Sequence, residues 1–190
     1  MSSLSRWCNF PIFADMRHLH RTLLFAITGI SLLLPACKSH KPHVAKPSRA
    51  DQKKREHLSE KLNLSLYESN NLALYTLIHE WLGVPHQDNG CTKSGTDCSC
   101  FVKMLLTEVY RKDVGRSSQE MYSKTQRIDQ VALKEGDLVF FKIKSVKISH
   151  VGLYLQENKF VHVSSTKGVM ISSLDEAYFK NSYAGAGRIK

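Results

Sequence analysis

The chain has 190 residues, of which 42% are hydrophobic and 23% are charged, and these values are typical of one globular domain. Its net charge of +10 is compatible with a nucleic acid, an anionic membrane or an anionic polymer as partner. Most of the excess positive charge lies before residue 58, however, and the rest has no dense basic stripe with interleaved aromatic side chains. Nucleic acid is therefore not an expected partner.

Residues 1–36 have the pattern of an export signal. Two arginines precede an apolar run over residues 23–34, which is too short to span a bilayer, since spanning takes about 20 apolar residues. Residues 34–37 (Leu-Pro-Ala-Cys) resemble a bacterial lipobox, which implies lipidation of Cys37 and a membrane-anchored, exported protein that faces the cell wall. Lys38 is not an acidic inner-membrane retention signal, so we expect the outer membrane if the cell is Gram-negative.

Residues 37–57 are predicted to be a lipid-anchored basic linker. They contain two prolines, many charges and almost no large apolar side chain, so they cannot bury enough surface to offset the entropy of ordering. Their charge would favour anionic headgroups or an anionic wall polymer, and plain solvated charge is an equal alternative. The folded domain is then expected over residues 58–190.

The domain is predicted to begin with helices. The polar residues 69–71 can cap a helix over residues 72–82, where apolar side chains recur at three- and four-residue steps. After a polar loop, Asp97 occupies the N-cap position of a second helix, with Phe101 and Leu105 on one face.

The C-terminal part is predicted to be a β-sheet, because from Gly136 onward the apolar period changes to two. The predicted strands cover residues 138–141, 151–155, 160–164 and 169–172. Helices followed by an antiparallel meander indicate an α+β fold, with the N-terminal helices packed on a central antiparallel sheet, rather than a parallel βαβ sheet.

Cys98 follows the predicted N-cap directly, so its sulfur would lie in the first turn of a helix. The free amide groups and the dipole at that position favour a thiolate. An isolated cysteine is more often a small buried hydrophobe. Two histidines favour the reactive alternative.

The pairing of two predicted strands brings these histidines together. If the apolar rows of both strands cover one core, Leu153 must pair near Val161, which requires a three-residue loop at 156–158. His150 and His162 then emerge together on the opposite face. Either histidine alone is more often an ordinary strand residue. Beside a helix-start cysteine, the pair supplies a base and an orienting group.

The remaining cysteines allow two interpretations. Cys91, Cys98 and Cys100 could bind zinc with a histidine, but their spacing lacks the usual C-x2-4-C knuckle. A disulfide between Cys91 and Cys100 is favoured in an exported protein and would leave Cys98 free. The spacing alone does not decide which of the two neighbouring cysteines is oxidised.

Several motifs together resemble, in order and spacing, those of the NlpC/p60 cell-wall peptidases, over about residues 70–189. They are Trp81-Leu82-Gly83-Val84-Pro85, Asn89-Gly90, Asp97-Cys98-Ser99-Cys100-Phe101-Val102, Arg116-Ser117-Ser118, Gly136-Asp137-Leu138-Val139-Phe140-Phe141, His150-Val151-Gly152-Leu153-Tyr154 and Phe160-Val161-His162. The resemblance implies a papain-like fold in which Cys98 is the nucleophile, His150 the general base and acid, and His162 the residue that orients His150.

The resemblance also implies a substrate, the stem peptide of peptidoglycan. The hydrolysed amide would be the γ-D-glutamyl-diamino acid bond or the D-alanyl-diamino acid crosslink. Asp97 and Ser99 match positions that help to hold the substrate amine in the first type. The implied enzyme starts from a thiolate-imidazolium pair, needs no cofactor or metal, and is expected to be a monomer.

Two positions depart from the family pattern. His86 stands where the family usually has a tyrosine near the oxyanion and the substrate amine, and it can still donate a hydrogen bond. Cys100 replaces the usual glycine, so its side chain must be accommodated in the first helical turn. A thiol amidase or acyltransferase for another substrate therefore stays open, as does a non-catalytic peptidoglycan-binding lipoprotein, although no member of the Cys-His-His set is missing.

Overall fold

The structure, a computed structural model, describes residues 48–189, so the predicted export signal and Cys37 lie outside the described residues. The strands are β1 (Cys91–Thr92), β2 (Gly95–Thr96), β3 (Gln126–Ile128), β4 (Leu138–Phe141), β5 (His150–Tyr154), β6 (Lys159–Ser164), β7 (Gly168–Ser173) and β8 (Tyr183–Arg188). The helices are α1 (Arg49–Leu62), α2 (Leu72–Trp81), α3 (Cys98–Tyr110), α4 (Ser118–Lys124), the 3-10 helix η1 (Gln130–Ala132) and α5 (Ala177–Ser182).

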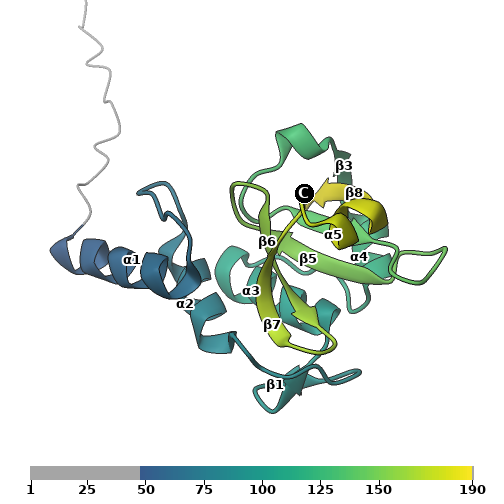
Figure 1. Ribbon diagram of the computed structural model, residues 1–190, viewed down its shortest axis with the longest axis horizontal. Coiled ribbons are helices and arrows are strands. Elements are labelled where there is room, and N and C mark those ends of the chain that lie inside the picture. Colours follow the sequence, from purple (N-terminus) through teal and green to yellow (C-terminus); the bar gives the residue numbers. More distant parts are fainter. Residues whose placement is uncertain (1–47, 190) are drawn as a thin grey trace, which may run out of the picture. The chain divides into compact units, whose positions relative to one another are not determined.

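Six strands form one sheet in the order β3-β8-β4-β5-β6-β7, and all neighbouring pairs are antiparallel. Helix α3 packs against β5 and β6, and α2 packs against α3 (Figure 1). This arrangement confirms the predicted α+β class with N-terminal helices on a central antiparallel sheet. It also sets the start of α3 beside the strands that carry the two histidines.

Helix α1 corrects the prediction of a flexible linker, because residues 49–57 are helical. The Ser48 hydroxyl caps the helix by accepting a hydrogen bond from the Asp51 amide. At the other end Leu58 and Leu62 are buried, and α1 packs against α2. The composition of this segment predicted no order, but packing of its C-terminal leucines and hydrogen bonds from Arg55 to the Tyr67 and Asn70 carbonyls hold the helix against the domain.

The sheet is larger than the predicted meander. Strands β3 and β8 were missed, and β8 inserts between β3 and β4 although it is last in the chain. Its sequence is rich in glycine and alanine, which rarely signal a strand. A Cβ atom at Gly187 would collide with the Thr125 side chain, so close packing rather than strand propensity explains this composition.

Both faces of the sheet carry apolar clusters, and β4 alternates between them. Leu138 and Phe140 face the main core, which contains the buried side chains of α2 and α3. Val139 and Phe141 face a smaller cluster that includes Phe179 from α5. The histidine face of the sheet is therefore partly covered, which keeps water away from the rings.

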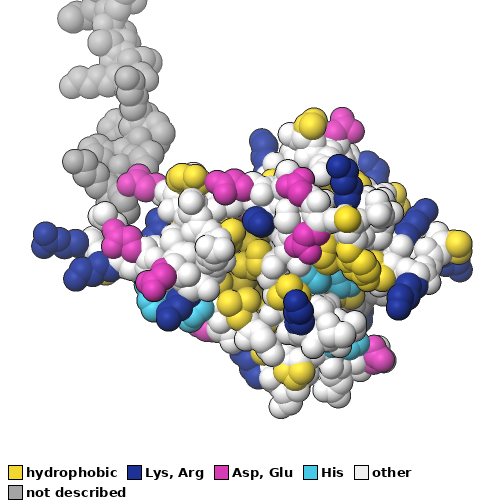
Figure 2. Space-filling model, viewed as in Figure 1, with side chains coloured by type: hydrophobic (Ala, Val, Ile, Leu, Met, Phe, Trp, Pro, Cys, Tyr) yellow, Lys and Arg dark blue, Asp and Glu magenta, His cyan; other side chains and the backbone are white. Residues whose placement is uncertain are grey.

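The surface drawn in Figure 2 carries Lys and Arg side chains scattered among Asp and Glu rather than gathered into one stripe. Within residues 48–189, no helix has the length and apolar character needed to cross a membrane.

Candidate active site

The N-terminus of α3 places Cys98 in the first helical turn, as predicted. Asp97 is the N-cap, and its Oδ1 accepts a 2.7 Å hydrogen bond from the Cys100 amide. Cys100 is disulfide-bonded to Cys91, with their Cα atoms 5.5 Å apart. Cys98 is the free cysteine among the described residues. The disulfide interpretation is confirmed, and Cys91 and Cys100 are not available as zinc ligands.

The surroundings of Cys98 favour a thiol over a thiolate. Burial raises the pKa of the Cys98 thiol, and the negative charge of Asp97 raises it further. The backbone amides of Val151, Ser99 and Cys98 lower the pKa, but the net value lies above the ordinary one. The direction of this shift is opposite to the one expected for a cysteine at a helix start. The helix start does stabilise negative charge, yet the loss of water around the sulfur outweighs it.

Strands β5 and β6 bring the two histidines together in the predicted register. Leu153 pairs with Val161, and Asn158 in the connecting loop has a positive φ of 58°. His150 Nε2 lies 3.0 Å from His162 Nδ1, a hydrogen-bond distance. The contact leaves Nδ1 of His150 as the ring nitrogen free for proton exchange with a nucleophile.

Strand β7 adds a residue that the sequence analysis did not identify. Ser172 Oγ lies 3.0 Å from His162 Nε2, and both side chains are buried. His162 pairs with Met170 across the strands, so Ser172 is its diagonal neighbour on the same face. Finding it from sequence would have required the β6–β7 register, which the prediction did not specify.

Both histidines are held neutral by their environment. Burial lowers the pKa of His150 to about 4, and His86 lowers it further by electrostatic repulsion. Burial also lowers the pKa of His162 to about 3, with repulsion from His150 as the next cause. Burial thus favours the uncharged forms of all three groups, a thiol and two neutral imidazoles, in the resting site.

Asp97 and Ser99 form a charged network with Arg116. The Arg116 guanidinium donates to Asp97 Oδ2 at 2.7 Å and to Asp97 Oδ1 at 3.1 Å, and it donates to Ser99 Oγ at 2.9 Å. Ser99 Oγ in turn donates to Asp97 Oδ1 at 2.7 Å. Burial raises the pKa of Asp97, but hydrogen bonds from Arg116, the Cys100 amide and Ser99 outweigh it and hold the pKa below its ordinary value.

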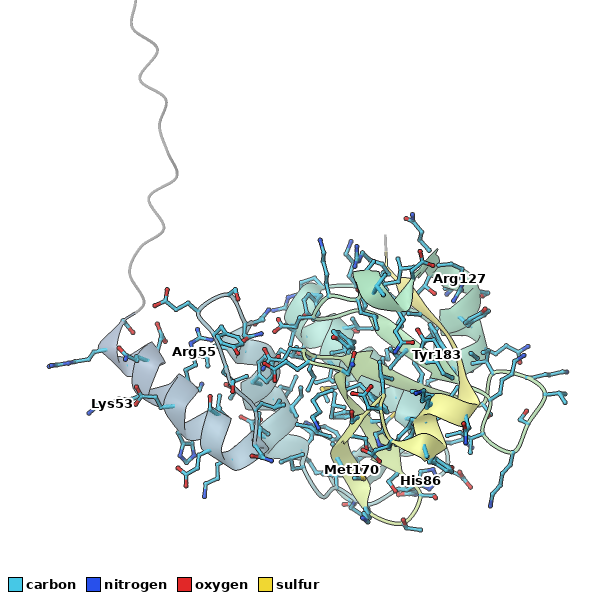
Figure 3. All side chains as sticks on the ribbon, turned by 45° about the horizontal axis from the view of Figure 1, so that its top comes forward. Lys53, Arg55, His86, Arg127, Met170 and Tyr183 are labelled. Carbon is cyan, nitrogen blue, oxygen red and sulfur yellow. A yellow bond between two sulfur atoms is a disulfide. The ribbon has the colours of Figure 1, made fainter. Side chains whose placement is uncertain are left out.

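These groups line one cleft of about 670 Å³, which contains Cys98, both histidines, Ser172, Asp97, Ser99 and His86. The loop carrying His86 is tied to β7, because Val169 exchanges backbone hydrogen bonds with Gly83 and Val84. Figure 3 shows His86 and Met170 at the same end of the sheet, and both line this cleft. All six predicted site residues that lie in residues 48–189 thus line the same cleft.

The profile of the NlpC/P60 family matches residues 83–188. The chain belongs to the NlpC/P60 family. Among curated relatives, the probable endopeptidase NlpC of Escherichia coli is 35% identical over 170 residues, which cover 89% of this chain and 99% of that protein. The murein DD-endopeptidase/murein LD-carboxypeptidase MepS of Escherichia coli is 39% identical over 110 residues, 58% of each chain. The match to MepS therefore spans less than two thirds of its length.

A crystal structure of an NlpC/P60 family protein from Bacillus cereus superposes with a TM-score of 0.55 at 27% identity, covering 60% of this chain and 38% of that one. The likeness agrees with the papain-like NlpC/P60 fold expected from the motifs.

The two departures from the NlpC/P60 pattern have structural explanations. Cys100 fits the first turn of α3 because its sulfur is bonded to Cys91 in the neighbouring hairpin. His86 pairs with Thr96 in an isolated β-bridge, and its Nε2 lies 3.6 Å from Asp88 Oδ1. Its imidazole is half-buried at the cleft, so a hydrogen-bond donor is retained where the family usually has a tyrosine.

Within residues 48–189, no group of three or more His, Cys, Asp or Glu side chains is arranged to hold a metal ion.

Proposed function

We propose that this chain is a cysteine peptidase that hydrolyses an amide bond in the stem peptides of peptidoglycan. The observation that carries the proposal is the 3.0 Å contact between His150 Nε2 and His162 Nδ1 in the cleft that also contains Cys98. A nucleophile, a base and a group that orients the base together form a triad that can hydrolyse an amide by covalent catalysis.

The proposed reaction starts from the neutral pair. As the Cys98 sulfur attacks the amide carbonyl carbon, its proton passes to His150 Nδ1, so charge separation occurs only when the reaction requires it. The tetrahedral intermediate then collapses, and protonated His150 gives this proton to the leaving amine. Water next attacks the thioester, with His150 as base, and releases the carboxylate and the free thiol.

The start of α3 and His86 are proposed to stabilise the oxyanion. The Cys98 amide lies at the helix N-terminus, where backbone N–H groups have no intrahelical partner. The His86 imidazole borders the same cleft and can supply a second hydrogen bond. Asp97 and Ser99 remain the proposed site for the substrate amine, with Arg116 holding both in place.

Two bonds in the stem peptide are candidates for hydrolysis. The name of MepS assigns a DD-endopeptidase activity to that relative. That name supports the D-alanyl-diamino acid crosslink, and the family resemblance keeps the γ-D-glutamyl-diamino acid bond as the second candidate. Either product has a distinct mass, so one experiment separates them.

The test is a digest of purified peptidoglycan fragments, analysed by mass spectrometry, with the wild-type protein beside Cys98→Ala. We expect the wild type to release a defined peptide and the variant to release none, because Cys98 is the free cysteine of residues 48–189 and lines the cleft. Failure of the wild type on tri-, tetra- and crosslinked stems would reject the substrate. Turnover by Cys98→Ala would reject the mechanism.

We also propose that the protein is exported and anchored through a lipid on Cys37, facing the cell wall from the outer membrane if the cell is Gram-negative. The lipobox-like sequence supports this proposal. Membrane fractionation of wild type and Cys37→Ser tests it. We expect the wild type to sediment with membranes and the variant to be released, and an unmodified Cys37 in the mature wild type would contradict the anchor.

A further inference from the structure

Ser172 extends the contact between the two histidines to a third strand. Its hydroxyl oxygen lies 3.0 Å from His162 Nε2. Only 4% of Ser172 and 3% of His162 is exposed, so bulk water is a poor substitute partner for this nitrogen. The contact joins β6 to β7 on the face of the sheet that borders the cleft.

The His162 ring is fixed between aromatic neighbours. Its centroid lies 5.0 Å from that of Phe160 and 5.0 Å from that of Phe179. The ring therefore cannot turn freely to exchange its two nitrogens. Nδ1 stays directed at His150 and Nε2 at Ser172.

The positions of the protons on His150 and His162 determine which group donates in each of these two hydrogen bonds. To accept a proton from Cys98, neutral His150 must have a free lone pair on Nδ1, so its own proton is on Nε2. That proton is donated to His162 Nδ1, which must therefore be unprotonated. Neutral His162 then carries its proton on Nε2 and donates it to Ser172 Oγ.

The opposite direction would disable the base. If Ser172 donated to His162 Nε2, the His162 proton would be on Nδ1 and would point at His150 Nε2. His150 would then carry its proton on Nδ1 and could not accept one from Cys98. One hydrogen-bond direction is compatible with catalysis, and the other is not.

We propose that Ser172 is a positioning residue that accepts a hydrogen bond from His162 Nε2 and thereby selects the tautomers that leave His150 Nδ1 free as the base. The inference rests on the proposed peptidase function. Ser172 does not contact the reacting atoms in this scheme and acts through His162 and His150.

The carbonyl of Val163 also interacts with the His162 ring and is a second acceptor near it. This carbonyl belongs to the backbone and is present in every side-chain variant. A substitution at Ser172 therefore isolates the contribution of the hydroxyl.

The test compares the full-length wild type with Ser172→Ala, Ser172→Thr and Ser172→Cys. Long-range ¹⁵N–¹H NMR of the histidine rings reports directly which nitrogen is protonated. We expect Nε2–H on His162 in the wild type and in Ser172→Thr, which keeps the hydroxyl. Ser172→Ala should gain the Nδ1–H form, and Ser172→Cys, with a weaker acceptor, should fall between.

Kinetics on peptidoglycan fragments supply the second readout. Ser172→Ala should lower kcat/KM about tenfold, the cost of leaving one buried donor unpaired, mainly through kcat. Ser172→Thr should restore most of the loss. Ser123→Ala, which removes an exposed hydroxyl on α4, is the matched control and should match the wild type.

An unchanged His162 tautomer in Ser172→Ala overturns the inference, whatever the activity. The same result in Ser172→Cys overturns it independently if the alanine variant does not fold. If the wild type fails to cut any peptidoglycan fragment, the proposed function fails, but the NMR result still decides whether Ser172 sets the tautomer.

Discussion

The two walls of the cleft differ in the polar interactions that they carry. The helix wall, at the start of α3, carries a formal ion pair, because Arg116 Nη2 lies 2.7 Å from Asp97 Oδ2. The sheet wall carries His150, His162 and Ser172 in a chain of neutral hydrogen bonds. One wall therefore carries a paired positive and negative charge, and the other carries uncharged rings and a hydroxyl.

This difference assigns separate tasks to the walls. Buried neutral imidazoles are poor permanent charges but are ready to accept a proton, because protonation is needed only when the sulfur attacks. The ion pair of Asp97 and Arg116 is suited to holding a charged group of the substrate in a fixed position. Four predictions test this division, ordered by the size of the expected effect.

Removing the base should produce the largest change. We expect His150→Ala to lower kcat by about 10³-fold, because the sheet wall then has no group to accept the Cys98 proton. Steady-state hydrolysis of peptidoglycan fragments measures it. His57→Ala is the control, since His57 is exposed on α1 and its ring contacts His79, outside the cleft. Equal losses in both variants would show that His150 has no specific chemical role.

Lowering the pH should reduce the free energy of unfolding through His150 and His162 before Asp97 contributes. Unfolded histidines bind protons below their ordinary pKa of 6.5, whereas folded His150 and His162 resist until about 4 and about 3. Between these limits the unfolded state binds more protons, so stability falls as pH falls, by up to about 1.4 kcal/mol per pH unit for each histidine. Asp97 has a lowered pKa, so its contribution is lost only at more acidic pH.

Urea unfolding of the wild type and His162→Gln at several pH values between about 7 and 5 measures this slope. The variant should show a shallower slope, because one of the two neutral buried histidines is gone. Identical slopes in the two proteins would mean that His162 is not held neutral by the fold.

Local signals were enough to predict most of the helix wall. The N-cap role of Asp97 and the position of Cys98 depend on residues within one turn of each other. The link to Arg116 was missed, because it joins residues 19 positions apart and Arg116 lies in the irregular segment after α3, which the apolar pattern does not describe. Helix α1 was missed for another reason, because two buried leucines among many charged residues give only a weak apolar pattern.

On the sheet wall, correct prediction of the site residues depended on the strand register. The two histidines were placed correctly because apolar alternation on both strands determines how β5 pairs with β6. Ser172 was not found, because a diagonal contact needs a second register, between β6 and β7, and because serine carries no apolar signal. Strand β8 was missed because its glycines are selected by close packing rather than by strand propensity.

The disulfide should have the next largest effect, and it belongs to the helix wall. Cys91 and Cys100 are 9 residues apart, and closing so short a loop restricts the unfolded chain by about 2 to 3 kcal/mol. The double variant Cys91→Ser/Cys100→Ser should lose that amount in urea unfolding. Wild type treated with reductant is its matched control and should behave alike. No change in either would mean that the cross-link adds nothing to this wall.

The smallest effect concerns the ion pair itself. A double-mutant cycle of Asp97→Asn and Arg116→Gln should give a coupling energy of about 1 kcal/mol, because the Asp97 side chain is only 13% exposed and the contact is bidentate. Asparagine is chosen because it retains the N-cap of α3. The reference cycle is Glu108 with Arg111, a 3.9 Å pair whose side chains are 60% and 80% exposed, and it should give a coupling near zero. Equal coupling energies in the two cycles would mean that the Asp97–Arg116 pair is no stronger than an ordinary surface ion pair. The charge on the helix wall would then not stabilise the site more than any other exposed charge does.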